Sequence, residues 1–323
     1  MLHKFSYKRA ATLQEAVTAS ARPDAHILAG GTDLLGCLRD EVFTASTVVS
    51  LNGLKEIKGI SARPGGGLRI GALTTLTEIA ENKKLLADYP VLAQAAASAA
   101  SPQLRNQGTL GGNLCQRPRC WYFRGNFPCF RRGGDLCSAM DGENEYHAIF
   151  GGDPCFMVHP SDTAPALVAL DAKVTIAGPK GPRTIPLASF YVLPKDDFLK
   201  ETVLAPGEVV TEILLGPAPA GSKSVYRKVR ERGAFDFAVT GAAIVVTLAA
   251  RKVSGARIVL SGVAPAPWRS EAAEKAILGK PLDAAAITVA AEAAVKGASP
   301  LARNGYKIAL VKGVIEEILT AMA

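Results

Sequence analysis

The sequence predicts an α+β fold built in two parts. Its 323 residues exceed the usual length of one domain. Short strand-like and helix-like segments are interleaved over the earlier part of the chain, whereas three strands and then three helices occupy the last hundred residues. Between the two lies a Pro-, Gly- and Ser-rich stretch, PAPAGSKS, at 217–224. Such a stretch is typical of a linker, so we place the boundary between the two parts there.

Capping patterns and apolar runs define the elements before this linker. Thr12 with Glu15, and Thr75 with Glu78, have the spacing of capping boxes at helix starts. The expected elements are a helix over 12–20, an apolar strand and helical turn within 26–35, strands over 46–51, 67–73, 173–177 and 208–215, a helix after Thr75, and helices over 90–100 and within 159–172.

The last hundred residues change character. Two strands are expected within 223–250, and a third over 256–263, where apolar and polar residues alternate with a period of two. Helices follow at about 271–278, 283–296 and 303–322, where apolar residues recur every three to four positions. A small sheet with a helical bundle is therefore predicted.

Composition narrows the function classes. No apolar run approaches the ~18 residues that a membrane span needs. The net charge is +8, but the basic residues are scattered and no basic stripe is interleaved with aromatic residues. The sequence therefore argues against a membrane span and against nucleic-acid binding.

Two glycine-rich turns are candidates for binding a phosphate group. Gly30-Gly31-Thr32-Asp33 follows a strand, and a second turn spans Gly108 to Asn113. Glycines at such junctions let the backbone approach a ligand, and exposed amides there bind phosphate well. Two such loops favour two grips on one diphosphate, although two unrelated tight turns would give the same pattern. The GxGxxG fingerprint is absent.

Five of the six cysteines lie between Cys115 and Cys155. Disulfides are disfavoured, because the N-terminus has no secretory signal and five cysteines leave one unpaired. Zinc usually shows CxxC pairs, which are missing here. The wide, irregular gaps favour a loop that wraps an iron–sulfur cluster, whose four irons each need a thiolate. Spacing alone leaves zinc and free thiols open.

Five arginines without an intervening acid lie among the first of these cysteines: Arg117, Arg119, Arg124, Arg131 and Arg132. A four-thiolate cluster carries negative charge, which nearby guanidinium groups would offset. A solvated basic loop is the plainer alternative.

The motifs LAGGTDLL, TLGGN, HPSD and YRKVRERGAFDFAV together resemble the FAD-binding medium subunit of the molybdenum hydroxylases, the xanthine dehydrogenase and aldehyde oxidase family. The resemblance covers nearly the whole chain. It implies an FAD-binding PCMH-type domain of two α+β subdomains, like that of vanillyl-alcohol oxidase, over 1–218, with an iron–sulfur insert at 115–155. A CO dehydrogenase flavoprotein C-terminal domain, a small antiparallel sheet with a helical bundle, is implied for 219–323.

The cysteine-rich insert resembles two branches of this family that carry an extra [4Fe–4S] cluster, the aldehyde oxidoreductases and the 4-hydroxybenzoyl-CoA reductases. Their pattern maps the cluster ligands onto Cys120, Cys129, Cys137 and Cys155 and leaves Cys115 as a free thiol. The flanking CWYFR and GENEYHAIFGG are closer to the aldehyde oxidoreductase branch.

The resemblance also implies contacts to FAD. The first loop would cradle the pyrophosphate, the second would hold the flavin, Asp162 would bind ribityl or ribose hydroxyls, and Lys228 would reach the flavin or its phosphate. The expected FAD-binding residues are Leu28, Ala29, Gly30, Gly31, Thr32, Asp33, Leu34, Thr109, Gly111, Gly112, Asn113, Asp162 and Lys228. None is expected to be a catalytic acid or base, because the isoalloxazine carries the redox chemistry.

Partners follow from the same resemblance. They are a large molybdopterin-binding subunit, a small subunit with two [2Fe–2S] clusters, and an external electron carrier such as ferredoxin. The complex would oxidise an aldehyde or hydroxylate an aromatic or N-heterocyclic compound. A 4-hydroxybenzoyl-CoA reductase β subunit, a stand-alone flavoprotein oxidase and a zinc-stapled scaffold are the alternatives. A cytoplasmic location is expected, or a periplasmic one if a partner chain carries the export signal.

Overall fold

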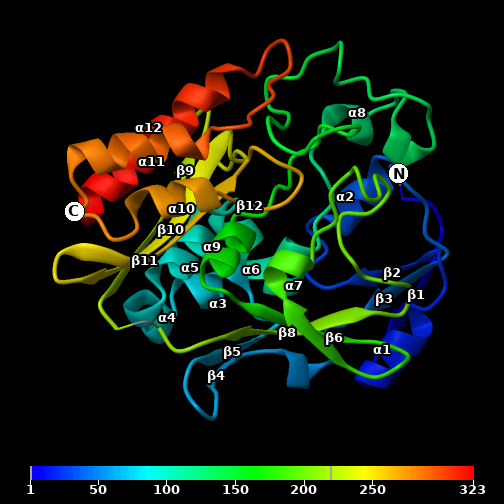
Figure 1. Ribbon diagram of the computed structural model, residues 1–323. Helices are drawn as coiled ribbons and strands as arrows, with labels where there is room; N and C mark the ends of the chain where they lie inside the picture. The colour runs from blue at the N-terminus through cyan, green and yellow to red at the C-terminus, as the bar shows by residue number, and fades with distance from the viewer. Residues whose placement is uncertain (1, 219) are drawn as a thin grey trace.

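The computed structural model describes residues 2–218 and 220–323 (Figure 1). The strands are β1 (Ser6–Arg9), β2 (Ala25–Leu28), β3 (Thr47–Ser50), β4 (Ile60–Ala62), β5 (Leu68–Gly71), β6 (Lys173–Ala177), β7 (Arg183–Pro186), β8 (Val209–Leu215), β9 (Ser222–Val229), β10 (Thr240–Ala249), β11 (Lys252–Ser261) and β12 (Trp268–Arg269). The α-helices are α1 (Leu13–Ala19), α2 (Leu34–Arg39), α3 (Leu76–Ala80), α4 (Lys83–Asp88), α5 (Pro90–Ser98), α6 (Pro102–Gln107), α7 (Leu110–Leu114), α8 (Trp121–Arg124), α9 (Thr163–Ala169), α10 (Glu271–Ile277), α11 (Ala284–Ala294) and α12 (Tyr306–Met322). Short 3₁₀ helices are η1 (Lys55–Ile57), η2 (Phe130–Arg132) and η3 (Leu187–Ser189).

Three sheets organise the described residues. A parallel three-stranded sheet has the order β1-β3-β2. An antiparallel five-stranded sheet has the order β4-β5-β8-β6-β7, and an antiparallel four-stranded sheet has the order β12-β11-β10-β9. The mixed α+β architecture predicted from the sequence is confirmed.

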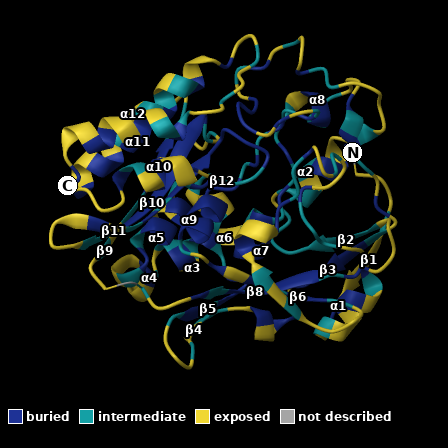
Figure 2. Ribbon diagram, in the orientation of Figure 1, coloured by how far each residue is buried: buried dark blue, intermediate teal, exposed yellow. Residues whose placement is uncertain are grey.

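The four-stranded sheet is covered on both faces, which explains why β10 is apolar almost throughout. Ala242, Ile244 and Val246 pack into the core under α10–α12, whereas Ala243 and Val245 pack into the core with α5 and α9. Figure 2 shows α9 buried along its whole length, while α11 and α12 expose their outer faces. Alternate residues of β10 thus pack against helices on opposite faces of the sheet.

Caps at the helix starts follow the sequence in detail. Thr75 and Glu78 form the full capping box at α3. At α1 the Thr12 hydroxyl accepts from the Glu15 N–H, but the Glu15 carboxylate accepts from Ala11 instead of Thr12. At α9 the hydroxyl of Ser161, not the carboxylate of Asp162, accepts the helix-start N–H of Ala164.

The predicted linker is partly strand, because β9 already begins at Ser222. Residue 219, within this linker, lies outside the described residues. Among the residues that are described, no helix combines the length and apolarity needed to cross a bilayer.

Residues 115–155 form a mostly irregular segment that contains only α8 and η2 and lies beside α2 in Figure 1. Residues at the start of α12 hold the C-terminal half of this segment in place by hydrogen bonds. The buried ammonium of Lys307 donates to the carbonyls of Tyr146, His147 and Gly262 at 2.7–3.0 Å. Asn304 donates to the carbonyls of His147 and Ala148. We call this set of bonds the α12 clamp.

Candidate functional site

A cavity of about 450 Å³ opens where the two glycine-rich loops meet. This volume falls within the range of sites for small molecules and cofactors. Its wall includes most of the predicted FAD-binding residues, namely Ala29, Gly30, Gly31, Thr32, Asp33, Leu34, Thr109, Gly111, Gly112, Asn113 and Asp162. Leu28 and Lys228 are the two that do not line it directly.

The first loop joins β2 to α2 and keeps its amides available. The backbone N–H groups of Gly30, Gly31 and Thr32 have no hydrogen-bond partner among the described residues. Gly31 has a φ of +76°, which favours glycine. A Cβ on Gly30 would collide with the carbonyl oxygen of Gln107, so only glycine lets the two loops pack this closely. Three free donors on one loop can hold an anionic group.

The second loop is fixed by the fold itself. The amides of Leu110 and Gly111 donate to the carbonyls of Thr74 and Ala72, and that of Gly112 donates to the Thr109 hydroxyl. The side chain of Asn113 is also held, because its Oδ1 accepts from the hydroxyls of Ser161 and Thr163, both at 2.6 Å. This leaves the Asn113 amide nitrogen as the donor that the loop can offer to a ligand.

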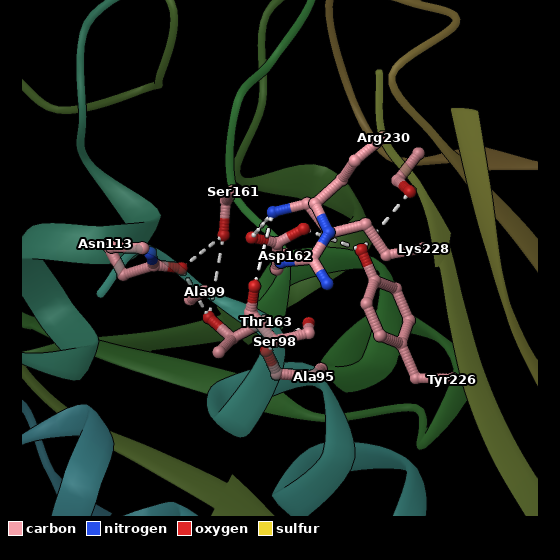
Figure 3. A network of polar contacts seen from close by, with 12 residues as sticks. Ala95, Ser98, Ala99, Asn113, Ser161, Asp162, Thr163, Tyr226, Lys228 and Arg230 are labelled. Carbon is pink, nitrogen blue, oxygen red and sulfur yellow. Dashed lines mark hydrogen bonds and ion pairs between the residues drawn. The ribbon is translucent and has the colours of Figure 1, made fainter. Parts of the chain in front are cut away.

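Asp162 links the cavity to the C-terminal strands, as Figure 3 shows. Its Oδ2 pairs with Lys228 Nζ at 2.8 Å, and its Oδ1 accepts from the Tyr226 hydroxyl at 2.7 Å. Burial raises the pKa of Asp162, and the charge of Lys228 opposes that rise. The ammonium of Lys228 also donates to the carbonyl of Ser98 at 3.3 Å. Lys228 therefore contacts the cavity through Asp162.

Asp33 connects the first loop to the cysteine-rich segment. Its Oδ2 accepts from the backbone N–H of Arg117 at 2.7 Å, and its Oδ1 pairs with Arg119 and Arg124 at 2.9 and 2.8 Å. Arg117 and Arg119 also line the cavity. Two of the five guanidinium groups that were expected to offset cluster charge thus pair with Asp33, and that of Arg132 donates to the backbone carbonyls of Gly125 and Glu41.

Four cysteines from separate parts of the segment come together. Cys129 and Cys137 are paired as backbone partners in an isolated antiparallel bridge. Burial raises the pKa values of Cys120, Cys129 and Cys137, that of Cys120 to about 12, and Cys155 lies close enough to all three to add to the rise. All six cysteines lie in the described part of the chain, and none forms a disulfide.

Hydrogen-bond donors surround these sulfur atoms. The amides of Tyr122 and Phe123 face Cys120 and act against the burial that raises its pKa. His147 Nε2 lies 3.2 Å from the Cys120 sulfur, and Arg131 Nε donates to the Cys155 sulfur at 3.3 Å. Such N–H···S contacts are a feature of iron–sulfur sites.

No three His, Cys, Asp or Glu side chains among the described residues converge closely enough to hold a single metal ion. The ligands of a zinc ion all bind one atom, whereas those of a four-iron cluster bind four different atoms.

The sequence reasoning missed several residues of the cavity wall. Phe43 and His26 stack with ring centroids 4.6 Å apart and line one side. Phe235 and Phe237 also line the cavity, and the guanidinium of Arg119 lies 4.9 Å from the ring of Phe237. The two exposed phenylalanines stand in the GAFDF motif, whose aromatic residues were the available signal.

Known proteins match both parts of the chain. Residues 3–218 match the family described as the FAD binding domain in molybdopterin dehydrogenase, and residues 224–322 match the CO dehydrogenase flavoprotein C-terminal domain. The chain is 40% identical to the aldehyde oxidoreductase FAD-binding subunit PaoB of Escherichia coli (strain K12), over 98% of this chain and 97% of that protein. It is 27% identical to the carbon monoxide dehydrogenase medium chain of Hydrogenophaga pseudoflava, over 98% and 96% of the two chains.

Solved structures agree with these matches. The carbon monoxide dehydrogenase of Hydrogenophaga pseudoflava that lacks the Mo-pyranopterin moiety has a chain with a TM-score of 0.79 and 29% identity, covering 99% of this chain and 98% of that one. Quinoline 2-oxidoreductase of Pseudomonas putida 86 gives a TM-score of 0.77 at 25% identity, covering 99% and 97%. The chain therefore belongs to the FAD-binding medium subunits of the molybdenum hydroxylases, the oxidoreductase family that includes xanthine dehydrogenase, aldehyde oxidoreductase and CO dehydrogenase.

Proposed function

We propose that this chain is an electron-transfer subunit that binds FAD in the loop-lined cavity and a [4Fe–4S] cluster at Cys120, Cys129, Cys137 and Cys155. One observation mainly supports this proposal. Four thiols that are far apart in the segment lie near one another close to the cavity, and N–H groups point at their sulfur atoms. The chain would relay electrons between the [2Fe–2S] clusters of a small subunit and an external carrier such as ferredoxin.

The cavity wall offers hydrogen-bond donors and acceptors that suit FAD. The three unpaired amides of Gly30, Gly31 and Thr32 would hold the pyrophosphate, and Asn113 would donate from its amide nitrogen. Asp162, whose two oxygens already accept from Tyr226 and Lys228, would orient hydroxyl groups of the cofactor. Bound flavin supplies the redox chemistry, so these residues only position and tune it.

The cysteine site suits a cluster because its surroundings favour thiolates over thiols once metal binds. Cys129 and Cys155 are buried and Cys120 and Cys137 are partly buried, and backbone amides of Arg131, Arg132 and Ala139 face Cys129 and Cys137. Thiolate ligands are deprotonated, and N–H donors stabilise their charge.

A packed bridge supports transfer between the two sites. Cys37, Phe123 and Cys129 form one apolar cluster, against which Phe43 and Cys120 pack. Phe43 also lines the cavity. The side chains that separate the cavity from the thiols are therefore in continuous contact.

The related subunits suggest which part of the complex each domain and each subunit forms. We propose that residues 1–218 form the flavin domain, that 219–323 form the C-terminal domain, and that the molybdenum centre lies on a large partner subunit. The 40% identity to an aldehyde oxidoreductase subunit favours an aldehyde as the substrate of the whole complex.

Metal and flavin analysis tests the proposal. The chain is purified anaerobically with co-expressed partner subunits, and iron, sulfide, zinc and FAD are measured. Cys129→Ser should abolish the EPR signal of the cluster and leave FAD bound. Zinc in place of iron, or loss of FAD together with the cluster, would contradict the proposed arrangement.

A further inference from the structure

Arg131 is the arginine of the segment that reaches a proposed cluster ligand. Its side chain is fully buried, with no exposed area. Its Nε donates to the Cys155 sulfur at 3.3 Å, one terminal nitrogen donates to Glu201 Oε1 at 2.6 Å, and the other donates to the carbonyl of Lys200 at 3.3 Å. All three nitrogens are used, so the guanidinium is fixed in one orientation.

Glu201 holds a second arginine with the same oxygen atom. Its Oε1 accepts from Arg117 Nε at 3.0 Å, and its side chain is only 10% exposed. Arg117 lines the cavity, and its guanidinium carbon lies over the rings of Phe43 and Phe123, at 5.4 and 5.2 Å from their centroids. One buried carboxylate thus touches a guanidinium at the cysteine site and another at the cavity.

From this geometry we infer that Glu201 is a positioning residue that couples the two cofactor sites and sets the reduction potentials of both. The inference rests on the proposed function. In a poorly solvated setting, a positive charge near a cofactor stabilises its reduced, more negative state and raises its potential. The carboxylate of Glu201 offsets part of the charge of Arg131 and Arg117 and so lowers the potential at both ends.

Two variants are therefore expected to shift the reduction potential of the cluster in opposite directions. Glu201→Gln keeps an acceptor oxygen for the guanidinium groups but removes the negative charge, so both the cluster and the flavin should titrate at higher potential than in wild type. Arg131→Met removes the positive charge and the N–H···S bond, so the cluster should shift to lower potential, with a smaller change at the flavin.

The measurement is a redox titration of the full complex, followed by EPR for the cluster and by absorbance for FAD, after iron and flavin contents are determined. Glu212→Gln serves as the control, because it removes the negative charge that pairs with Arg69 in the five-stranded sheet. This variant should leave both potentials at their wild-type values.

The outcomes separate the two hypotheses. Wild-type complex without iron would overturn the proposed function and this inference with it. Full iron and FAD in Glu201→Gln, with unchanged potentials, would overturn the inference alone. Loss of iron from Glu201→Gln would reduce Glu201 to a structural role and likewise overturn it. A rise confined to one of the two cofactors would refute the coupling.

Discussion

Lys228 and Asp162 form a 2.8 Å ion pair whose side chains are 3% and 5% exposed. The pair joins β9 to the loop that precedes α9 and lies at the edge of the cavity. Removing one partner of a buried pair leaves an uncompensated charge, which typically costs about 3–5 kcal/mol.

Lys228→Met should therefore lower the free energy of unfolding by about 3–5 kcal/mol. Denaturant titration of the isolated subunit measures the loss. Arg227→Met is the matched control, because Arg227 pairs with Glu317 in an exposed position on the same strand and should change stability by less than about 1 kcal/mol. Adding Asp162→Asn to Lys228→Met should recover part of the loss. Equal effects of the two single variants would contradict this account.

Gly30→Ala should abolish FAD binding in the cavity. The new methyl group would meet the Gln107 carbonyl, so the first loop must move away and its free amides with it. Gly36→Ala tests the same chemistry in the next helix, where an added Cβ meets nothing within 4 Å, and FAD should stay bound. The ratio of flavin absorbance to protein gives the result. Retention of FAD by Gly30→Ala would exclude the proposed role of this loop.

His159 should make the folded state sensitive to acid. Burial lowers its pKa to about 4, and the nearby carbonyl of Leu114 acts in the opposite direction. In the unfolded chain this imidazole has a pKa near 6.5. Keeping it neutral in the folded state therefore costs nothing above that pH, but the free energy of unfolding falls as the pH is lowered towards 4, by ~3 kcal/mol for this group.

Unfolding measured between pH 4 and 7 should therefore show a flatter pH dependence for His159→Gln than for wild type. His3→Gln, which changes an exposed histidine, should follow the wild-type curve. If all three proteins lose stability in parallel, His159 is not the group responsible.

Cys115→Ala should keep a full complement of iron. Burial raises the pKa of Cys115 to about 12, and this residue packs with the core of the N-terminal region instead of with the four gathered thiols. Cys120→Ala, its matched comparison, should lose the iron. Iron analysis of the two proteins decides between them, and loss of iron from Cys115→Ala would reassign the ligand set.

Local patterns predicted the parts of the fold that local physics decides. The capping box at Thr75 and Glu78 and the three C-terminal helices lie close to where the sequence placed them. The glycine turns also identified the cavity wall, since Gly30 and Gly111 are needed for close approach of neighbouring backbone. These signals reside within a few residues of one another.

Contacts between distant segments were not predictable in this way. Arg117 and Glu201 are 84 residues apart, and so are the partners Asp33 and Arg117. The sequence spacing grouped five arginines around the cysteines. Tertiary packing instead sends the guanidinium groups of Arg119 and Arg124 to Asp33 and that of Arg117 to Glu201, whereas that of Arg131 reaches a sulfur atom. Which arginine meets which acid depends on how the segment folds back, and no local spacing encodes that.

The α12 clamp sets an order for biosynthesis. Residues 146–148 are held by Asn304 and Lys307, which lie 156–161 residues further along the chain and are therefore synthesised later. His147, the neighbour of Cys120, takes its place only after those residues have been made. Iron loading at the proposed site is then expected only after residues 304–307 have been synthesised, and a nascent chain stalled before residue 300 would present its thiols without the neighbours that shape them.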